Sequence, residues 1–254
     1  MKNKKLIFFL IIYPLLASLI SNIFSINLLV SIILFYAIPS IILSIKNKKI
    51  VKKSFLFALI IIPIYIAIES IGTISKTWKV NTLFSFSIFG TTIEGILWAF
   101  FTIYLIIIFY ETFLDYNIKE KSNYPRLKFI IILSIFIFGL FFIFLTHYNY
   151  LLNIPYFYLI LGIIIILIPS LSMLFSHRRL INKFLITGSY FFFFHLVYEI
   201  TALKLGWWSF PGTQVIGRVS LLGVTFPFEE FLFFILFLVL AVLSYYEFFD
   251  DDEK

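Results

Sequence analysis

The chain has 254 residues, of which 62% are hydrophobic and 13% are charged, and its mean hydropathy is +1.06. A water-soluble domain of this size is excluded, because helices that are apolar on all sides must face lipid or the interior of a bundle. The absence of cysteine excludes disulfides, iron–sulfur sites and thiol nucleophiles, and the net charge of +7 comes largely from lysines in short loops, which indicates membrane topology and not nucleic-acid binding.

Eight segments are long and apolar enough to cross a bilayer, which takes about 20 residues of helix. In chain order they are 5–23, 26–45, 53–72, 88–113, 128–147, 153–175, 183–203 and 222–247. The first has the basic start and apolar middle of a signal peptide. We expect it to be retained as a helix, because it has a counterpart later in the chain. The sequence therefore predicts an all-α integral membrane protein with eight transmembrane helices.

Similar residues recur in the same order about 130 residues apart, which indicates a duplication. The matched groups are Ile38-Pro39-Ser40 with Ile168-Pro169-Ser170, Glu69 with Glu199, Trp78 with Trp208, Glu94 with Glu229, and Tyr110-Glu111 with Tyr246-Glu247. We predict a first four-helix unit over residues 1–125 and a second over 126–254. Because four is an even number of crossings, both units have the same orientation, so the 4+4 tandem repeat is parallel and not inverted.

The basic residues predict the orientation in the cell membrane. Of the 20 lysines and arginines, 16 fall in alternate connecting segments that include both chain ends, and only Lys76, Lys79, Lys204 and Arg218 fall on the other side. Under the positive-inside rule, both termini are expected in the cytoplasm.

Five glutamates are expected to collect at the outer ends of the helices. Glu69 and Glu199 come near the ends of the third and seventh helices, and Glu94, Glu229 and Glu230 come in the first turns of the fourth and eighth. Carboxylates in a first turn are favoured by the helix dipole, which is the structural reading of the Glu229-Glu230 pair. Successive helical residues point about 100° apart, so the two cannot face the same way, and one can face the bundle interior while the other pairs with a neighbouring helix. The convergence of acids from two related units favours a functional site.

A desolvated carboxyl group tends to keep its proton near neutral pH, because burial disfavours the charged form. It can then act as an acid toward an apolar substrate, while aromatic faces stabilise the resulting cation. Aromatic side chains are expected within reach at Trp98, Trp207, Trp208, Phe231, Phe233 and Phe234.

His195 precedes Glu199 by one helical turn in the run HLVYE, so the two share a helix face. A proton relay and a hydrogen-bonded interior histidine are both open readings. A metal site is not expected, because His147 and His177 fall on opposite loops. No dinucleotide, NTP or HExxH motif occurs, so no cofactor is expected.

The run Gly206-Trp207-Trp208-Ser209-Phe210-Pro211, followed by Gly217, PFEEFLFF and YYE, resembles the membrane-embedded lycopene cyclase domain family. The match covers residues 195–249 well and residues 65–115 weakly. The resemblance implies a redox-neutral isomerase: an acid protonates the end of a linear carotenoid, the cation closes a six-membered ring, and a base removes a proton.

By position, the resemblance makes Glu229 and Glu230 the acid and its partner. Glu69 and Glu199 would orient this pair or take the final proton. Glu94 matches the motif only partly, since Thr92 and Gly95 replace the family's proline and second glutamate. The substrate-binding candidates are Trp98, Trp207, Trp208, Phe233, Phe234, His195 and Tyr198.

Two other functions fit the same residues. A carotenoid hydratase or long-chain-carotenoid cyclase would use the same protonated end, and a proton-coupled transporter would use the acids to carry protons. The expected partners are a lycopene-like carotenoid and membrane lipid, with no nucleic acid; a second copy of the chain and other carotenoid enzymes are further candidates.

Overall fold

The computed structural model describes residues 4–115 and 127–250. Within these ranges eight helices are long and apolar enough to cross a membrane, which confirms the predicted number and the all-α membrane class. The spans are α1 (Lys4–Phe24), α2–η1–α3 (Leu28–Ile32, Ile33–Ala37 and Ile38–Lys46), α4 (Val51–Ile74), α5 (Ile93–Phe113), α6 (Leu127–His147), α7–η3–α8 (Phe157–Leu161, Gly162–Leu167 and Ile168–Ser176), η4–α9 (Arg178–Leu180 and Ile181–Leu205), and η5–α10 (Glu230–Phe237 and Leu238–Asp250).

Two of the predicted spans, 88–113 and 222–247, begin too early. The residues before α5 form the hairpin β2 (Ser87–Ile88) and β3 (Thr91–Thr92), and those before η5 form β5 (Arg218–Leu221) and β6 (Val224–Pro227). Gly90 and Gly223 both have a φ of +85°, a value that glycine adopts at no steric cost. Hydropathy counts these hairpins as helix because many of their residues are apolar, but the helices begin only after the hairpins.

Two spans change to π-helix just before a proline, over η1 and η3. Pro39 and Pro169 lack an N–H and their rings crowd the carbonyl four residues earlier, so the preceding turn widens. Tyrosines satisfy carbonyls in both wide turns: Tyr13 Oη donates to Leu34 O at 2.7 Å, and Tyr245 Oη donates to Ile165 O at 3.0 Å.

The eighth span begins with a longer π segment, η5, directly after Glu229. Its first residues, from Glu230 to Ile235, include four that are buried. The wide turn places this segment against α9 and η3, which are its main helical neighbours.

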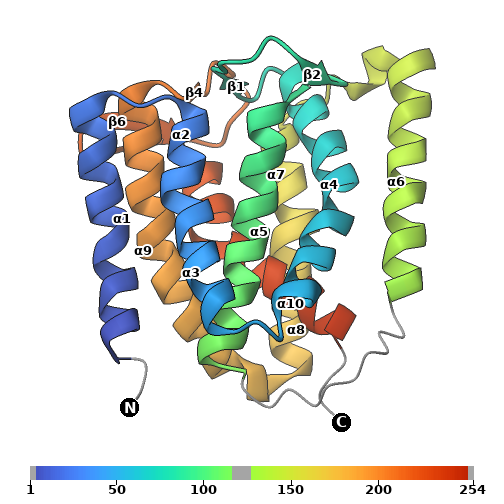
Figure 1. The fold of residues 1–254 in the computed structure, drawn as a ribbon. Helices are drawn as coiled ribbons and strands as arrows, with labels where there is room; N and C mark the ends of the chain where they lie inside the picture. Colours follow the sequence, from blue (N-terminus) through green and yellow to red (C-terminus); the bar gives the residue numbers. More distant parts are fainter. Residues whose placement is uncertain (1–3, 116–126, 251–254) are drawn as a thin grey trace.

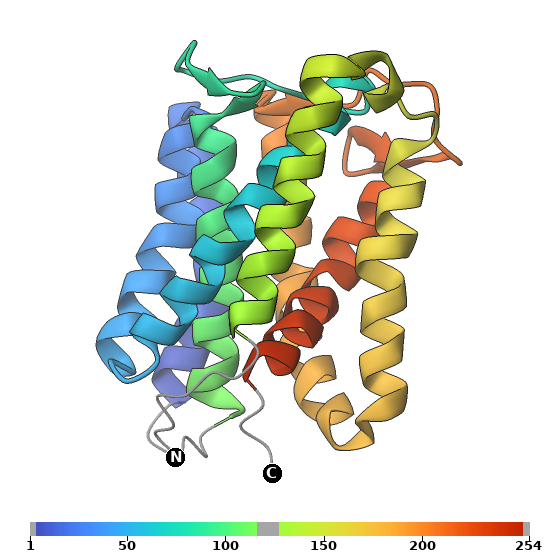
Figure 2. The same cartoon turned by 90° about the vertical axis from the view of Figure 1, so that its right-hand side faces the viewer.

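The helices form one bundle with α5 inside it, since α5 packs against α3, α4, α9 and α10 and is buried along most of its second half. α1 lies on the outer side of α9, and α6 lies at the opposite edge against α4 (Figures 1 and 2). α1 begins and α10 ends at the same end of the bundle (Figure 1). The hairpins lie at the other end.

A short antiparallel pair joins the two long loops at the hairpin end. β1 (Lys79–Val80) pairs with β4 (Trp208–Ser209), with Lys79 opposite Ser209 and Val80 opposite Trp208. Asn81 extends the contact, because its Nδ2 donates to Gly206 O at 2.6 Å and its backbone N–H donates to Trp207 O at 2.8 Å. The loops after α4 and α9 are therefore fixed to each other.

Candidate functional site

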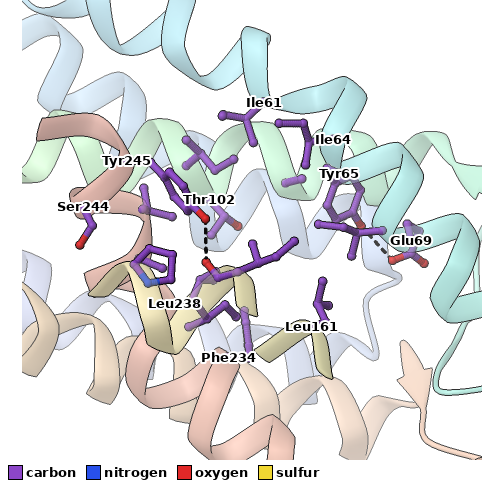
Figure 3. A pocket seen from close by; sticks show the side chains of 18 of the residues that line it. Ile61, Ile64, Tyr65, Glu69, Thr102, Leu161, Phe234, Leu238, Ser244 and Tyr245 are labelled. Carbon is purple, nitrogen blue, oxygen red and sulfur yellow. Dashed lines mark hydrogen bonds between the residues drawn. The ribbon is translucent and has the colours of Figure 1, made fainter. Parts of the chain in front are cut away.

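An elongated apolar cavity of about 720 Å³ runs between α4, α5, α6, α7–α8 and α10. Its lining includes Glu230 at the start of η5 and Phe248 near the end of α10, so the cavity follows the eighth span over most of its length. Figure 3 shows Tyr65 and Glu69 at one end of the cavity, and Ser244 and Tyr245 at the other.

Two carboxyl groups line the hairpin end of this cavity, and they come from different spans. Glu69, on α4, is only 6% exposed, and its Oε2 accepts hydrogen bonds from Tyr65 Oη at 3.3 Å and Trp78 Nε1 at 3.0 Å. Tyr65 lies one helical turn before Glu69 (Figure 3), whereas Trp78 belongs to the loop after α4. Both donors hold this carboxyl group in a fixed orientation at the cavity wall.

The second carboxyl group is that of Glu230, which is also 6% exposed. Tyr158 Oη on α7 donates a hydrogen bond to Glu230 Oε2. The carboxyl group of Glu230 also lies beside that of Glu199 on α9, which is fully buried and accepts from Trp208 Nε1 at 3.0 Å. The other carboxyl oxygen of Glu199, Oε2, is buried without a hydrogen-bond partner in the part of the chain that the structure describes. Two neighbouring carboxyl groups from different spans therefore lie together beside the cavity.

Aromatic side chains connect Glu69 with the Glu199–Glu230 pair on both sides. The Trp78 ring contacts the Tyr158 ring edge-on at 5.3 Å, on one side. On the other side, Trp98 lies between Tyr65, at 6.1 Å, and Trp208, at 6.3 Å. Seven of these side chains line the cavity: Tyr65, Glu69, Trp78, Trp98, Tyr158, Trp208 and Glu230. Together with Glu199, which does not line it, we call these eight residues the acid–aromatic ring.

Glu94 and Glu229 do not line the cavity. Both are fully buried and bind backbone N–H groups of the loops before their helices. Glu94 Oε1 accepts from Leu83 N at 2.8 Å and Phe84 N at 3.0 Å, and Glu229 Oε1 accepts from Ile216 N at 2.7 Å. Their place at helix starts favours a role in holding the hairpin loops.

The predicted substrate-binding residues divide between the cavity and the core. Trp98, Trp208 and Phe234 line the cavity. Phe233 is buried against Gly162 and Tyr158, and Trp207 donates from Nε1 to Ile26 O at 2.8 Å. These two side chains form the wall behind the cavity.

Tyr198 and His195 are fully buried on α9 and lie outside the cavity lining. Tyr198 packs among Tyr36, Trp207 and Trp208. The imidazole of His195 stacks on the Phe234 ring with centroids 4.8 Å apart, so it supports a ring that does line the cavity.

The sequence predictions did not include Tyr65 and Tyr158 in the site, and treated Trp78 only as a repeat marker. The one-turn spacing of Tyr65 from Glu69 was a usable signal. No pattern in the sequence connects Tyr158 with Glu230, which is 72 residues away in the chain.

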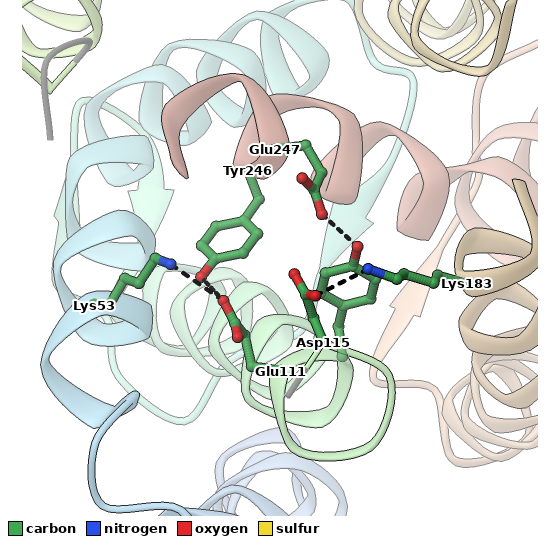
Figure 4. Close-up of polar contacts among 7 residues, drawn as sticks. Lys53, Glu111, Asp115, Lys183, Tyr246 and Glu247 are labelled. Carbon is green, nitrogen blue, oxygen red and sulfur yellow. Dashed lines mark hydrogen bonds and ion pairs between the residues drawn. The ribbon is translucent and has the colours of Figure 1, made fainter. Parts of the chain in front are cut away.

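A second polar cluster lies at the opposite end of the bundle (Figure 4). Lys53 Nζ is 3.3 Å from Glu111 Oε1, which also accepts a hydrogen bond from Tyr246, and Tyr110 donates to Glu247. Lys183 Nζ and Asp115 Oδ1 form a further ion pair at 2.9 Å. These contacts join α4, α5, α9 and α10. In the part of the chain that the structure describes, no group of three or more His, Asp or Glu side chains is arranged to bind a metal.

No protein-family profile, no curated protein and no solved structure matches this chain.

Proposed function

We propose that the protein is a membrane-embedded enzyme that cyclises the ends of a linear carotenoid in the bilayer, in the manner of a lycopene cyclase. The observation that carries this proposal is the pair of neighbouring buried carboxyl groups, Glu199 and Glu230, at the hairpin end of a long apolar cavity. In the proposal the two groups share one proton, which is shielded from water and faces a space that fits an extended apolar chain.

In the proposed reaction Glu230 is the acid. Its O–H bond breaks as a C–H bond forms at the terminal double bond of the carotenoid, which leaves a carbocation on the adjacent carbon. A neighbouring double bond attacks this carbon and closes the ring. Loss of a proton next to the new cation restores a double bond, so one proton is given, one is taken, and the product is an isomer of the substrate.

The acid–aromatic ring and Phe234, which also lines the cavity, supply the other parts of this reaction. The π faces of Trp98, Trp208 and Phe234 stabilise a cation in a place without water to quench it. Glu69 faces the same end of the cavity from α4 and is the proposed base, oriented by Tyr65 and Trp78. Tyr158 is the proposed positioning residue of Glu230.

We also propose that the chain arose by duplication, as a 4+4 repeat. Four observations support this. Trp78 binds Glu69 as Trp208 binds Glu199, at 3.0 Å in both cases. Tyr110 binds Glu247 as Tyr246 binds Glu111, and Lys79 stands opposite Ser209. The π segments η1 and η3 both precede an Ile-Pro-Ser triplet.

In the proposed orientation, both termini are cytoplasmic, and the acid–aromatic ring lies toward the outer leaflet of the cell membrane. The support for this orientation is the distribution of lysine and arginine among the connecting segments.

Expression in a lycopene-accumulating host, followed by chromatography and mass spectrometry of the pigments, tests the proposed function. Cyclisation gives a ringed product of unchanged mass, whereas a hydratase adds one water. Unchanged pigments from a host that contains the folded protein would contradict the carotenoid assignment. Transport of a solute in response to a pH gradient, without covalent change, would favour the transporter.

A further inference from the structure

The cavity has a second feature, an opening in the side of the bundle. Several of its lining residues are also exposed on the outside of the protein: Phe129 by 55%, Leu133 and Phe248 by 40%, and Tyr245 by 38%. Because these side chains face both the cavity and the surroundings, the cavity opens between them. They belong to the first half of α6 and the last turns of α10.

The α6 side of the opening is apolar. Phe129 and Leu133 lie on α6, which has the highest mean hydropathy of the eight spans, 3.0, and is buried over only 17% of its most apolar window. A surface of this composition faces hydrocarbon in a membrane protein. The opening therefore leads to the lipid and not to water.

Of the spans that line the cavity, α6 packs against the fewest others. Its extensive contacts are with α4 and with the 3₁₀ turn η2 (Asn149–Leu152), and it makes none of comparable extent with α7, α8 or α10. The ring of Phe129 contacts that of Phe248 edge-on, with centroids 6.2 Å apart, so these two side chains close the opening where they meet. Figure 1 shows α6 at the outer edge of the bundle.

We propose that this opening, with Phe129 and Phe248 at its edges, is the access route by which a long apolar polyene passes sideways from the bilayer into the cavity. The inference rests on the proposed function for the nature of the ligand. One end of the chain advances to the acid–aromatic ring, and α6 moves against α4 to let it pass.

The chain has no cysteine, so a pair can be introduced without a background of native thiols. In Phe129→Cys/Phe248→Cys, a short thiosulfonate cross-linker joins α6 to α10 across the opening, and a reductant releases it. The probe is methyl parinarate, an apolar conjugated tetraene whose absorption overlaps tryptophan emission. Trp78, Trp98 and Trp208 line the cavity, so quenching of tryptophan fluorescence in liposomes reports loading.

The matched control joins two spans away from the cavity. Ser18 Oγ on α1 and Thr201 Oγ1 on α9 are 2.7 Å apart, and neither residue lines the cavity. Ser18→Cys/Thr201→Cys is expected to load at the same rate before and after cross-linking. A slowing shared by both pairs would assign the effect to general stiffening of the bundle and would overturn the proposal.

Cross-linking of the Phe129/Phe248 pair is expected to slow loading about tenfold or more, and reduction is expected to restore the rate, because access depends on separation of the two helices. An unchanged rate would overturn the proposed route, and so would a reduced protein that does not take up the probe. Lycopene conversion by the reduced variant is measured separately. Its absence, with normal gated loading, would count against the cyclase and not against the opening.

Discussion

The indole N–H of Trp78 donates to Glu69 Oε2 at 3.0 Å, although the two residues belong to a loop and to the helix before it. The same relation holds for Trp208 and Glu199, also at 3.0 Å. Since β1 pairs with β4 directly beside these tryptophans, the loops hold each other and each orients an acid. The loops at the hairpin end are therefore part of the site.

Gly72 is required for the position of Trp78, and this gives the first prediction. A Cβ atom at Gly72 would lie 2.1 Å from Cζ2 of the indole, which is itself packed against Phe157 and Tyr158. Gly72→Ala is expected to displace the indole, break its bond to Glu69 and lower the free energy of unfolding by about 1–3 kcal/mol. Chemical denaturation in detergent and a shift in tryptophan emission measure both effects.

Gly139→Ala is the control, because a Cβ there meets nothing within 4 Å. It is expected to be neutral or to stabilise α6 by up to about 1 kcal/mol through helix propensity. If the two alanine variants behaved alike, the packing argument for Gly72 would be wrong.

The second prediction concerns the proposed acid. Glutamine has nearly the shape of glutamic acid but no acidic proton, so Glu230→Gln is expected to reduce lycopene conversion at least about 100-fold. Conversion is measured by chromatography of the pigments in liposomes. Wild-type conversion by Glu230→Gln would exclude Glu230 as the acid. Loss of conversion in Glu229→Gln alone would assign this role to Glu229.

Tyr158→Phe gives a third, graded prediction. It removes the hydrogen bond to Glu230 and leaves the ring, and conversion is expected to fall about tenfold without loss of fold. Tyr156→Phe is the neighbouring control, since Tyr156 is 47% exposed and lies outside the cavity lining. Equal conversion by both variants would remove Tyr158 from the site.

Hydropathy alone predicted the eight spans, because spanning a bilayer demands continuous apolar helix. It placed the starts of two spans too early, because Gly90 and Gly223 turn apolar residues into hairpins and glycine's positive φ is a local choice that average hydropathy does not register. The 100° step between Glu229 and Glu230 predicted that the two would face differently, and in the structure Glu230 lines the cavity while Glu229 binds Ile216 N. Which one faces inward depends on packing against α7 and α9, which the local sequence does not specify.

Lys53 and Glu111 give the fourth prediction, at the far end of the bundle. Their side chains are 6% and 2% exposed, so removal of one charge leaves the other buried. Lys53→Met is expected to lower the free energy of unfolding by about 3–5 kcal/mol, and a second change, Glu111→Gln, should recover part of this loss. Denaturation of the two single variants and the double variant measures the coupling; additive effects would show that the ion pair contributes nothing of its own.

The fifth prediction concerns orientation, on which the outer-leaflet position of the acid–aromatic ring depends. Lys48, between α3 and α4, and Lys204, near the end of α9, are exposed at opposite ends of the bundle, and the chain has no native thiol. Because positively charged loops are retained in the cytoplasm, an impermeant maleimide is expected to label Lys204→Cys in intact cells and Lys48→Cys only after permeabilisation. The reverse pattern would place the ring at the cytoplasmic leaflet, and the opening beside Phe129 would then meet the outer half of the bilayer.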